Sequence, residues 1–355
     1  MVRTENTATS DLVFSPCTIG SLSLRNRIVM APMNRVHDSS GNPVPLVKKY
    51  GVPSDNLIEH FRLRARGGTA LILSGGICIE SEYSRSADSV TRFETNEQIA
   101  QWARVVSAVH GEGALFAPQL WHMGLAAPLP VGPSGFDDYK QGQAKVRIMD
   151  EQDIEDAIQV FVHAVVNAVQ IGCDAIEIHG AHGFLIDNFM NKHQNRRTDC
   201  YGGTMENRMK FPCDLLRHVR DRVNREFPIL FRFNLHGESK EELAVIVSSL
   251  AGSGADILDL SSNDALAKGF DDGEGETMIG TVRRLSGIPV MAVGGIGKTV
   301  RQNDIYAVGD PSPAFSLIEK HEADLLGVGK GLLANPDWVD KVQKNEWRSL
   351  RPFIE

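Results

Sequence analysis

The sequence predicts an α/β fold, a single (β/α)8 TIM barrel, from two features of its apolar pattern. Eight short apolar segments recur along the 355 residues, and each ends in a small or polar residue. Their apolar character is continuous rather than alternating, which is typical of parallel strands buried on both faces. Amphipathic segments separate them without a linker or a break in composition, so one barrel is favoured over two doubly wound domains. The predicted strands are 27–32, 69–76, 114–122, 174–183, 228–234, 256–262, 289–295 and 324–331.

The clearest predicted helix covers 151–171. Its apolar residues, among them Ile154 and Ile158, recur at intervals of three and four, which indicates one buried face. Asp150 is placed to cap the start of this helix, and Gly172 follows its end. The other predicted helices are 54–66, 97–110, 205–225, 239–252, 277–286 and 335–345.

Two connections are too long to be simple turns. They cover 33–53, which is rich in glycine and proline, and 122–148. Loops of this length in a compact domain usually serve as lids or other functional elements. We therefore expect one domain over 1–355 with two long loops.

The composition is that of an ordinary globular protein, with 42% hydrophobic and 23% charged residues. The net charge is −8 and no run of Lys or Arg is present, so neither nucleic acid nor an anionic membrane is an expected partner. No signal peptide and no apolar stretch of about 18 residues is visible, which predicts a cytoplasmic protein. The five cysteines lack CxxC spacing, which argues against a disulfide framework, a zinc ribbon and a cysteine-ligated iron–sulfur cluster.

Polar and glycine residues gather at the ends of the predicted strands. In a barrel of this type the active site lies at the carboxyl ends of the strands, so these residues are expected to converge. The candidates at or near these ends are Asn34, Gly75, Gly76, Gln119, His122, His179, His182, Arg232, Gly294, Gly295, Gly329 and Lys330.

The histidines of the HGAHG segment allow two interpretations. His179 and His182 form either a hydrogen-bonded structural pair or a ligand-binding pair, and the flanking glycines, which let a ligand approach the backbone, favour the second. A three-histidine zinc site that includes His122 is a weaker alternative, because no carboxylate or HxH pattern accompanies these residues. We therefore expect no metal.

Glycine pairs at the ends of the last two predicted strands favour a site that binds an anion. Gly294 and Gly295, with Gly329 and Lys330, either cradle a phosphate or only form tight turns. Arg232 lies within an apolar strand, and an unpaired buried guanidinium is unfavourable by several kcal/mol. It requires an anionic partner, either a carboxylate or the electron-rich edge of a cofactor.

Several longer segments together match the pattern of one enzyme family. The segment HGAHGFLIDNFMNKHQNRRTDCYGGTMENRMKF at 179–211 resembles HGAHGYL…SPxxNxRTDxYGGSxENRxRF of the old yellow enzyme family of FMN-dependent oxidoreductases. NRIVMAPM at 26–33, QLWHMG at 119–124, the arginine of FRFN and GVGKGLLANPDW at 327–338 follow in the family's order, so the resemblance covers nearly the whole chain. It implies a barrel that holds FMN, is reduced by NADPH or NADH, and delivers hydride to an activated alkene.

The resemblance also implies roles for individual residues. Pro32, Met33, Asn34, Gly76 and Gln119 would line the flavin ring, Arg232 would face its N1/C2=O edge, and Gly295, Gly329 and Lys330 would hold the phosphate. His179 and His182 would donate hydrogen bonds to a carbonyl or nitro oxygen of a small-molecule substrate stacked on the flavin. Members of the family often form homodimers, so the resemblance allows a homodimer for this chain.

The chain departs from the family pattern at three positions. The family's usual proton-donor tyrosine is replaced by Phe184, which cannot donate, so a substitute donor such as Tyr83, Tyr50 or water would be needed. Asn34 stands where Thr or Cys commonly tunes the flavin, and Lys330 stands in place of an arginine at the phosphate. The chain also has no cysteine-rich iron–sulfur segment after the barrel. Electrons are therefore expected to come from a nicotinamide or from the substrate itself.

The Phe184 change leaves several activities open. An ene-reductase is favoured, and a redox-neutral isomerase or a flavin dehydrogenase that oxidises its substrate are alternatives on the same site. Two remoter alternatives are a metal-dependent barrel hydrolase and a non-catalytic protein that only binds flavin or another ligand.

Overall fold

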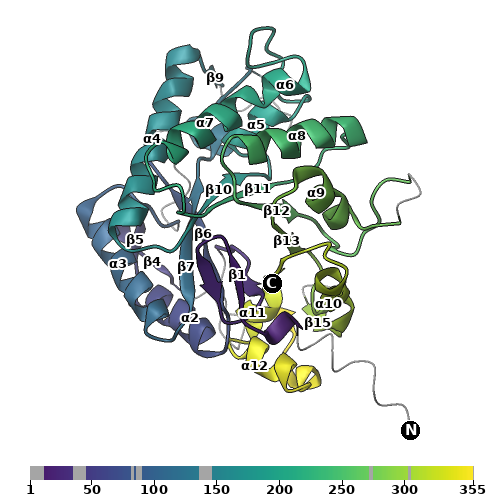
Figure 1. Ribbon diagram of the computed structural model, residues 1–355. Coiled ribbons are helices and arrows are strands. Elements are labelled where there is room, and N and C mark those ends of the chain that lie inside the picture. Colours follow the sequence, from purple (N-terminus) through teal and green to yellow (C-terminus); the bar gives the residue numbers. More distant parts are fainter. Residues whose placement is uncertain are drawn as a thin grey trace.

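Eight parallel strands close into one barrel (Figure 1). The computed structural model describes residues 12–34, 45–80, 84, 90–135, 146–271, 275–302 and 305–354. All eight predicted strands are confirmed, and the last one pairs with the first, which closes the barrel. In their order around the barrel the strands are β3 (Ile28–Met30), β6 (Leu71–Cys78), β7 (Leu115–Trp121), β10 (Ile176–Gly180), β11 (Ile229–Phe233), β12 (Ile257–Ser261), β13 (Val290–Val293) and β16 (Leu325–Val328).

Helices surround the barrel and follow the predicted order with four differences. The predicted helix 205–225 is two helices, because Pro212 has no N–H to continue the hydrogen-bond ladder across the junction. Three short helices, α5, α10 and α11, were not predicted. The helices are α2 (Asp55–Arg66), α3 (Asn96–His110), α4 (Glu151–Gln170), α5 (Leu185–Met190), α6 (Met205–Arg208), α7 (Lys210–Arg220), α8 (Lys240–Gly252), α9 (Met278–Ser286), α10 (Ser312–Glu319), α11 (Lys330–Ala334) and α12 (Trp338–Gln343).

Side-chain caps explain where the longest helices begin. The Asp150 carboxylate accepts a hydrogen bond from the Asp153 backbone N–H, and the Asp153 side chain accepts one from the Asp150 N–H in return. This reciprocal pair satisfies two N–H groups that a helix start would otherwise leave unpaired. Ser239 and Glu242 repeat the arrangement at α8.

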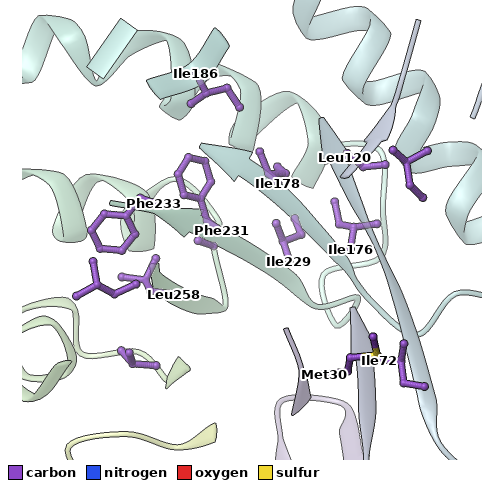
Figure 2. Close-up of a cluster of buried hydrophobic side chains, with 14 of the residues drawn as sticks. Met30, Ile72, Leu120, Ile176, Ile178, Ile186, Ile229, Phe231, Phe233 and Leu258 are labelled. Atoms are coloured by element: carbon purple, nitrogen blue, oxygen red, sulfur yellow. The ribbon is translucent and has the colours of Figure 1, made fainter. Parts of the chain in front are cut away.

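The strands bury their two faces in different ways. Outward-facing side chains pack under the helices, and Figure 2 shows several of them, including Ile176, Ile178 and Phe231. At the amino-terminal ends of the strands, the inward-facing side chains are apolar, such as Leu71 and Leu230, and fill the barrel. An N-terminal hairpin, β1 (Cys17–Ile19) and β2 (Leu22–Leu24), contributes to this inner cluster and closes that end. Polar inward-facing groups are left for the opposite end.

The long connections contain short secondary structure that the sequence did not predict. In 33–53, β4 (Val47–Lys48) and β5 (Val52–Pro53) form a hairpin, and in 122–148, β8 (Val131–Gly132) pairs with β9 (Arg147–Ile148). The rest of these two loops, 35–44 and 136–145, lies outside the described residues. A three-stranded antiparallel sheet of β14 (Lys298–Gln302), β15 (Ile305–Val308) and β17 (Phe353–Ile354) is also new.

Within the ranges that the structure describes, no helix combines the length and the apolar composition needed to cross a membrane.

Candidate active site

Polar side chains from four neighbouring strands face the interior at the carboxyl end of the barrel. The strand register places His179 of β10 opposite Arg232 of β11, and Arg232 opposite Asp259 of β12. One step lower, Glu177 of β10 lies opposite Gln119 of β7. At most 6% of each residue's surface is exposed. These polar groups therefore depend on one another for hydrogen bonds.

Arg232 has a carboxylate partner inside the protein. Its Nη1 donates to Asp259 Oδ2 over 2.5 Å, and its Nη2 donates to Ser261 Oγ over 2.9 Å. The sequence allowed either a carboxylate or the edge of a cofactor as the partner of Arg232, and the structure shows the carboxylate. The guanidinium charge is thereby balanced without any cofactor.

A second buried carboxyl group, Glu177, lies next to this ion pair. Gln119 Nε2 donates to Glu177 Oε2 over 2.6 Å. Burial raises the pKa of Glu177 well above its usual range, and the negative charge of Asp259 raises it further. Burial also raises the pKa of Asp259, although Arg232 acts in the opposite direction.

His179 and His182 lie side by side at the mouth, with ring centroids 5.3 Å apart. Burial lowers the pKa of His179 well below its usual range, and Arg232 lowers it further. Partial burial lowers the pKa of His182 as well, again with help from Arg232 and against the charge of Asp187. Both rings are therefore neutral at pH 7, and each carries one N–H donor. Nδ1 of His179 is buried without a hydrogen-bond partner in the described part of the chain.

A ring of hydrogen bonds fixes the turn that carries His182. This residue has φ +62°, a left-handed conformation that is unfavourable for a side chain other than glycine. Its backbone N–H donates to Asn234 Oδ1 over 2.6 Å, and the N–H of Gly183 donates to Asp187 Oδ2 over the same distance. His236 Nε2 lies 2.7 Å from Asp187 Oδ1 and 3.1 Å from Asn234 Nδ2. The three side chains together hold the turn in its strained conformation.

Phe184 occupies the wall beside the histidines. It precedes α5, and its ring lies edge-on to Trp121 with centroids 4.6 Å apart and 5.2 Å from the His179 ring. Trp121 in turn covers Gly76, where a Cβ would come within 2.6 Å of the indole. The wall next to His179 is thus an aromatic surface formed by Trp121 and Phe184.

The first two strands meet closely at the mouth. A Cβ at Gly75 would lie 1.8 Å from Asn34 Oδ1 and 2.6 Å from the carbonyl oxygen of Met33, so only glycine fits there. Pro32 and Met33 are half-buried, and Met33 Sδ lies 3.0 Å from the Cβ position of Gly329 at the end of β16. Residues from β3, β6 and β16 are therefore brought together as expected.

The ends of β13 and β16 present backbone in unusual conformations. Gly294 has φ +137° and Gly295 has φ +69°, and a Cβ at Gly294 would lie 2.5 Å from the carbonyl oxygen of Ser262. Lys330 follows at the start of α11, with its Nζ 3.3 Å from the ring centroid of Tyr306 in β15. The sheet of β14, β15 and β17 thus supplies a contact for this ammonium group that the sequence analysis did not include.

Two further candidates from the sequence are Tyr83 and His122. Tyr83, the suggested proton donor, lies outside the described residues. His122 directly follows β7 and is buried, with its carbonyl oxygen accepting from the Leu185 N–H at the start of α5. Its Nδ1 accepts from the Gly124 N–H, and burial lowers its pKa to about 3. Across the described ranges, no group of three or more His, Cys, Asp or Glu side chains could hold a metal ion. The structure therefore gives the three-histidine zinc alternative no support.

The sequence analysis missed several residues of this network. Glu177 and Asp259 are acidic residues inside apolar strands, which is the same signal that drew attention to Arg232. Ser261 ends a predicted strand and could have been included on that ground. Asn234 and His236 lie just beyond β11 in a loop, where no pattern singled them out.

Comparison with known proteins identifies the family. The model of the NADH:flavin oxidoreductase / NADH oxidase family matches residues 12–348. The chain belongs to this family, the old yellow enzyme family. It is 31% identical over 361 residues to an NADH oxidase of Thermoanaerobacter brockii, which covers 96% of this chain and 52% of that protein. It is also 31% identical over 332 residues to an NADPH dehydrogenase of Bacillus cytotoxicus, which covers 91% of this chain and 90% of that protein.

The family's fold is seen in a solved relative. The structure of morphinone reductase in complex with tetrahydroNAD matches with a TM-score of 0.76 and 23% identity, covering 96% of this chain and 92% of that one. This likeness establishes the TIM barrel. The chain spans about half the length of the NADH oxidase of Thermoanaerobacter brockii.

Proposed function

We propose that this chain is an FMN-dependent oxidoreductase that uses NADH or NADPH to reduce an α,β-unsaturated carbonyl or a similarly electron-poor compound. Membership of the NADH:flavin oxidoreductase family supports the reaction class. The observation that carries the proposal is the pair of neutral histidines, His179 and His182, beside the buried cation Arg232. Two N–H donors that stay neutral at pH 7 suit an uncharged oxygen acceptor better than an anion or a metal.

The residues present fit FMN. Gly294, Gly295 and Gly329 would present backbone N–H groups to a phosphate, and the positive φ angles of Gly294 and Gly295 are ones that glycine adopts readily. Lys330 belongs to the same strand end and supplies positive charge. Pro32, Met33, Asn34 and Gly76 would line the ring, with Gln119 and Arg232 at its polar edge. Bound FMN would supply a hydride carrier that accepts from a nicotinamide and donates to the substrate.

The chain's own side chains would polarise the substrate. His179 and His182 would donate hydrogen bonds to its carbonyl or nitro oxygen and draw electron density from the β-carbon. Arg232 would place positive charge where a reduced, anionic cofactor needs it. Trp121 and Phe184 would exclude water from one side of the substrate.

Phe184 favours a second candidate on the same site. A phenylalanine cannot protonate the α-carbon, and loss of a general acid typically slows a reaction about 10²- to 10⁴-fold. In a redox-neutral isomerase the substrate would accept a hydride and later give it back to the carrier, so no net protonation would be needed. The Phe-for-Tyr departure therefore supports isomerisation, or oxidation of the substrate, as the alternative to net ene reduction.

The decisive experiment is anaerobic absorption spectroscopy of the purified full chain, supplied with FMN. Bleaching of the flavin band by NADPH or NADH would support the proposal, and product analysis with a simple enone would then separate reduction from isomerisation. A flavin that binds but is bleached only by a substrate would favour the dehydrogenase alternative. Failure to bind FMN would overturn the proposal.

A further inference from the structure

Two carboxyl groups on β10 and β12, those of Glu177 and Asp259, lie within hydrogen-bonding reach of each other beneath the polar mouth of the barrel. Glu177 and Asp259 are both fully buried. One oxygen of each group has a donor, since Glu177 Oε2 accepts from Gln119 and Asp259 Oδ2 accepts from Arg232. The other oxygens, Glu177 Oε1 and Asp259 Oδ1, have no donor among the described residues.

The pair of carboxyl groups therefore lacks a hydrogen-bond donor between its two unpartnered oxygens. Buried carboxyl oxygens are almost always hydrogen-bonded, and two ionised carboxylates can only repel each other. One proton between the two unpartnered oxygens removes both problems, because a protonated carboxyl has an O–H donor and an ionised one has free acceptor sites. Burial, followed by the charge of Asp259, acts to keep the pKa of Glu177 high, so Glu177 is the group that holds this proton.

We propose that Glu177 is protonated and donates its O–H to Asp259, and that this shared proton makes Glu177 the positioning residue of Gln119 while Asp259 remains the anion that balances Arg232. The three ionisable groups then carry charges of zero, minus one and plus one. The buried cluster is neutral, which is the arrangement that a low-dielectric interior favours.

Among the described residues, no other charged group of the neighbouring strands competes for this proton. On the neighbouring strands β7 and β11 the facing groups are Gln119 and Arg232, and above the pair are the neutral rings of His179 and His182. The inward-facing side chains of β13 and β16 in the inner cluster, such as Met291 and Leu325, are apolar. Arg232 cannot release a proton, so the shared proton does not pass through it to the histidines.

The location of the proton fixes the orientation of Gln119. If Glu177 donates through one oxygen, its other oxygen is purely an acceptor and must receive the Gln119 Nε2 group. The carbonyl oxygen of the Gln119 amide is then left to accept a hydrogen bond from another partner. In the proposed function, on which this last step rests, that partner is an N–H group on the polar edge of the flavin.

The test compares Glu177→Gln with the unaltered chain by urea unfolding between pH 5 and pH 8. A glutamine reproduces the neutral acid, since its NH2 can donate to Asp259 and its oxygen can accept from Gln119. Unfolded Glu ionises near pH 4.3, whereas buried Glu177 stays protonated, so the unaltered chain loses folding free energy as pH rises. We expect the ratio of its folding constant to that of the variant to fall by about tenfold per pH unit.

Two further variants separate this effect from general ones. Glu319→Gln, at the exposed end of α10, is the control for removing a carboxyl and should show no such slope. Asp259→Asn removes the counter-ion of Arg232 and should lower stability throughout the pH range. A Glu177→Gln variant that is less stable than the unaltered chain by a constant factor, or that behaves like Asp259→Asn, would overturn the assignment of the proton to Glu177.

Infrared difference spectroscopy gives a readout that does not depend on the variant's folding. The unaltered chain should show a protonated-carboxyl C=O band at neutral pH that shifts in D2O, and its absence would overturn the proposal. Both measurements are made with and without saturating FMN. Failure of FMN to bind would overturn the proposed function only, because the shared proton belongs to the protein alone.

Discussion

His182 and Arg232 share one hydroxyl group, that of Ser261. Arg232 Nη2 donates to Ser261 Oγ over 2.9 Å, and His182 Nε2 lies 2.8 Å from the same oxygen. Because a guanidinium can only donate, the hydroxyl hydrogen is free to point at the histidine. Nε2 of His182 is then the acceptor, and the single proton of the neutral ring resides on Nδ1. Arg232 therefore influences which nitrogen of His182 is available as a donor.

Replacement of Ser261 by Ala is expected to remove the preference of His182 for the Nδ1–H tautomer. Nitrogen-15 NMR of histidine-labelled protein should show His182 mainly as the Nδ1–H form in the unaltered chain and as a mixture in Ser261→Ala. The free energy of unfolding should fall by about 1–3 kcal/mol, because a hydrogen bond to buried Arg232 is lost. Ser248→Ala on the exposed side of α8 is the matched control. An unchanged tautomer in Ser261→Ala would contradict this role of the hydroxyl.

The barrel could be predicted because its signal is local. Each strand is buried on both faces, so its continuous apolar run is visible without knowledge of its neighbours, as in 228–234. The sheet of β14, β15 and β17 could not be predicted in this way. It depends on pairing between Tyr306 and Phe353, which are far apart in the sequence. Nothing local indicates such a contact.

The site was predictable in some of its members but not in its pairings. The sequence showed that Arg232 needed an anion, yet the choice of Asp259 follows from the register of β11 on β12. The same holds for Glu177 and Gln119, which meet because β7 lies beside β10 in the closed barrel. Strand register is a property of the whole fold, so hydrogen-bond partners across strands remain beyond a single sequence.

The substrate-anchor role of the histidines predicts a loss of ligand binding. Replacing both His179 and His182 by Ala should weaken the binding of phenol-type ligands to the flavin-loaded chain by at least tenfold, because two donors to the ligand oxygen disappear. The change is measured by titrating the visible absorption of the flavin. His163→Ala on the exposed face of α4 serves as the control. Unchanged affinity in the double variant would rule out the anchor role.

The turn at His182 should respond to pH through His236. Burial lowers the pKa of His236, but the hydrogen bond and charge of Asp187 outweigh it, so the pKa is raised above 6.5. A raised pKa stabilises the fold below the unfolded value of about 6.5, and this contribution disappears as pH rises through the folded value. His236→Gln should therefore be less stable than the unaltered chain at pH 5.5, by about 1–3 kcal/mol, and the difference should shrink at higher pH.

Thermal or urea unfolding at several pH values checks this expectation. His163→Gln, which replaces an exposed histidine of α4, controls for the loss of an imidazole elsewhere. A His236→Gln deficit that is constant across the range, or that grows with pH, would contradict an ion pair between His236 and Asp187.

Restoring a hydroxyl at Phe184 tests whether a missing acid limits reduction. The Phe184 ring packs between Trp121 and His179, so a tyrosine at this position keeps the ring contacts and adds one polar atom at the edge of the substrate space. We expect Phe184→Tyr to raise the rate of enone reduction at least tenfold and to shift products from isomerised to reduced alkene, because a general acid contributes about 10²- to 10⁴-fold. Phe184→Leu, which alters the ring contacts without adding a donor, should show no gain.

Product ratios and single-turnover reoxidation of the reduced flavin measure both effects. An equal rate in Phe184→Tyr and the unaltered chain would mean that another group already protonates the α-carbon, and the isomerase alternative would then lose its structural basis.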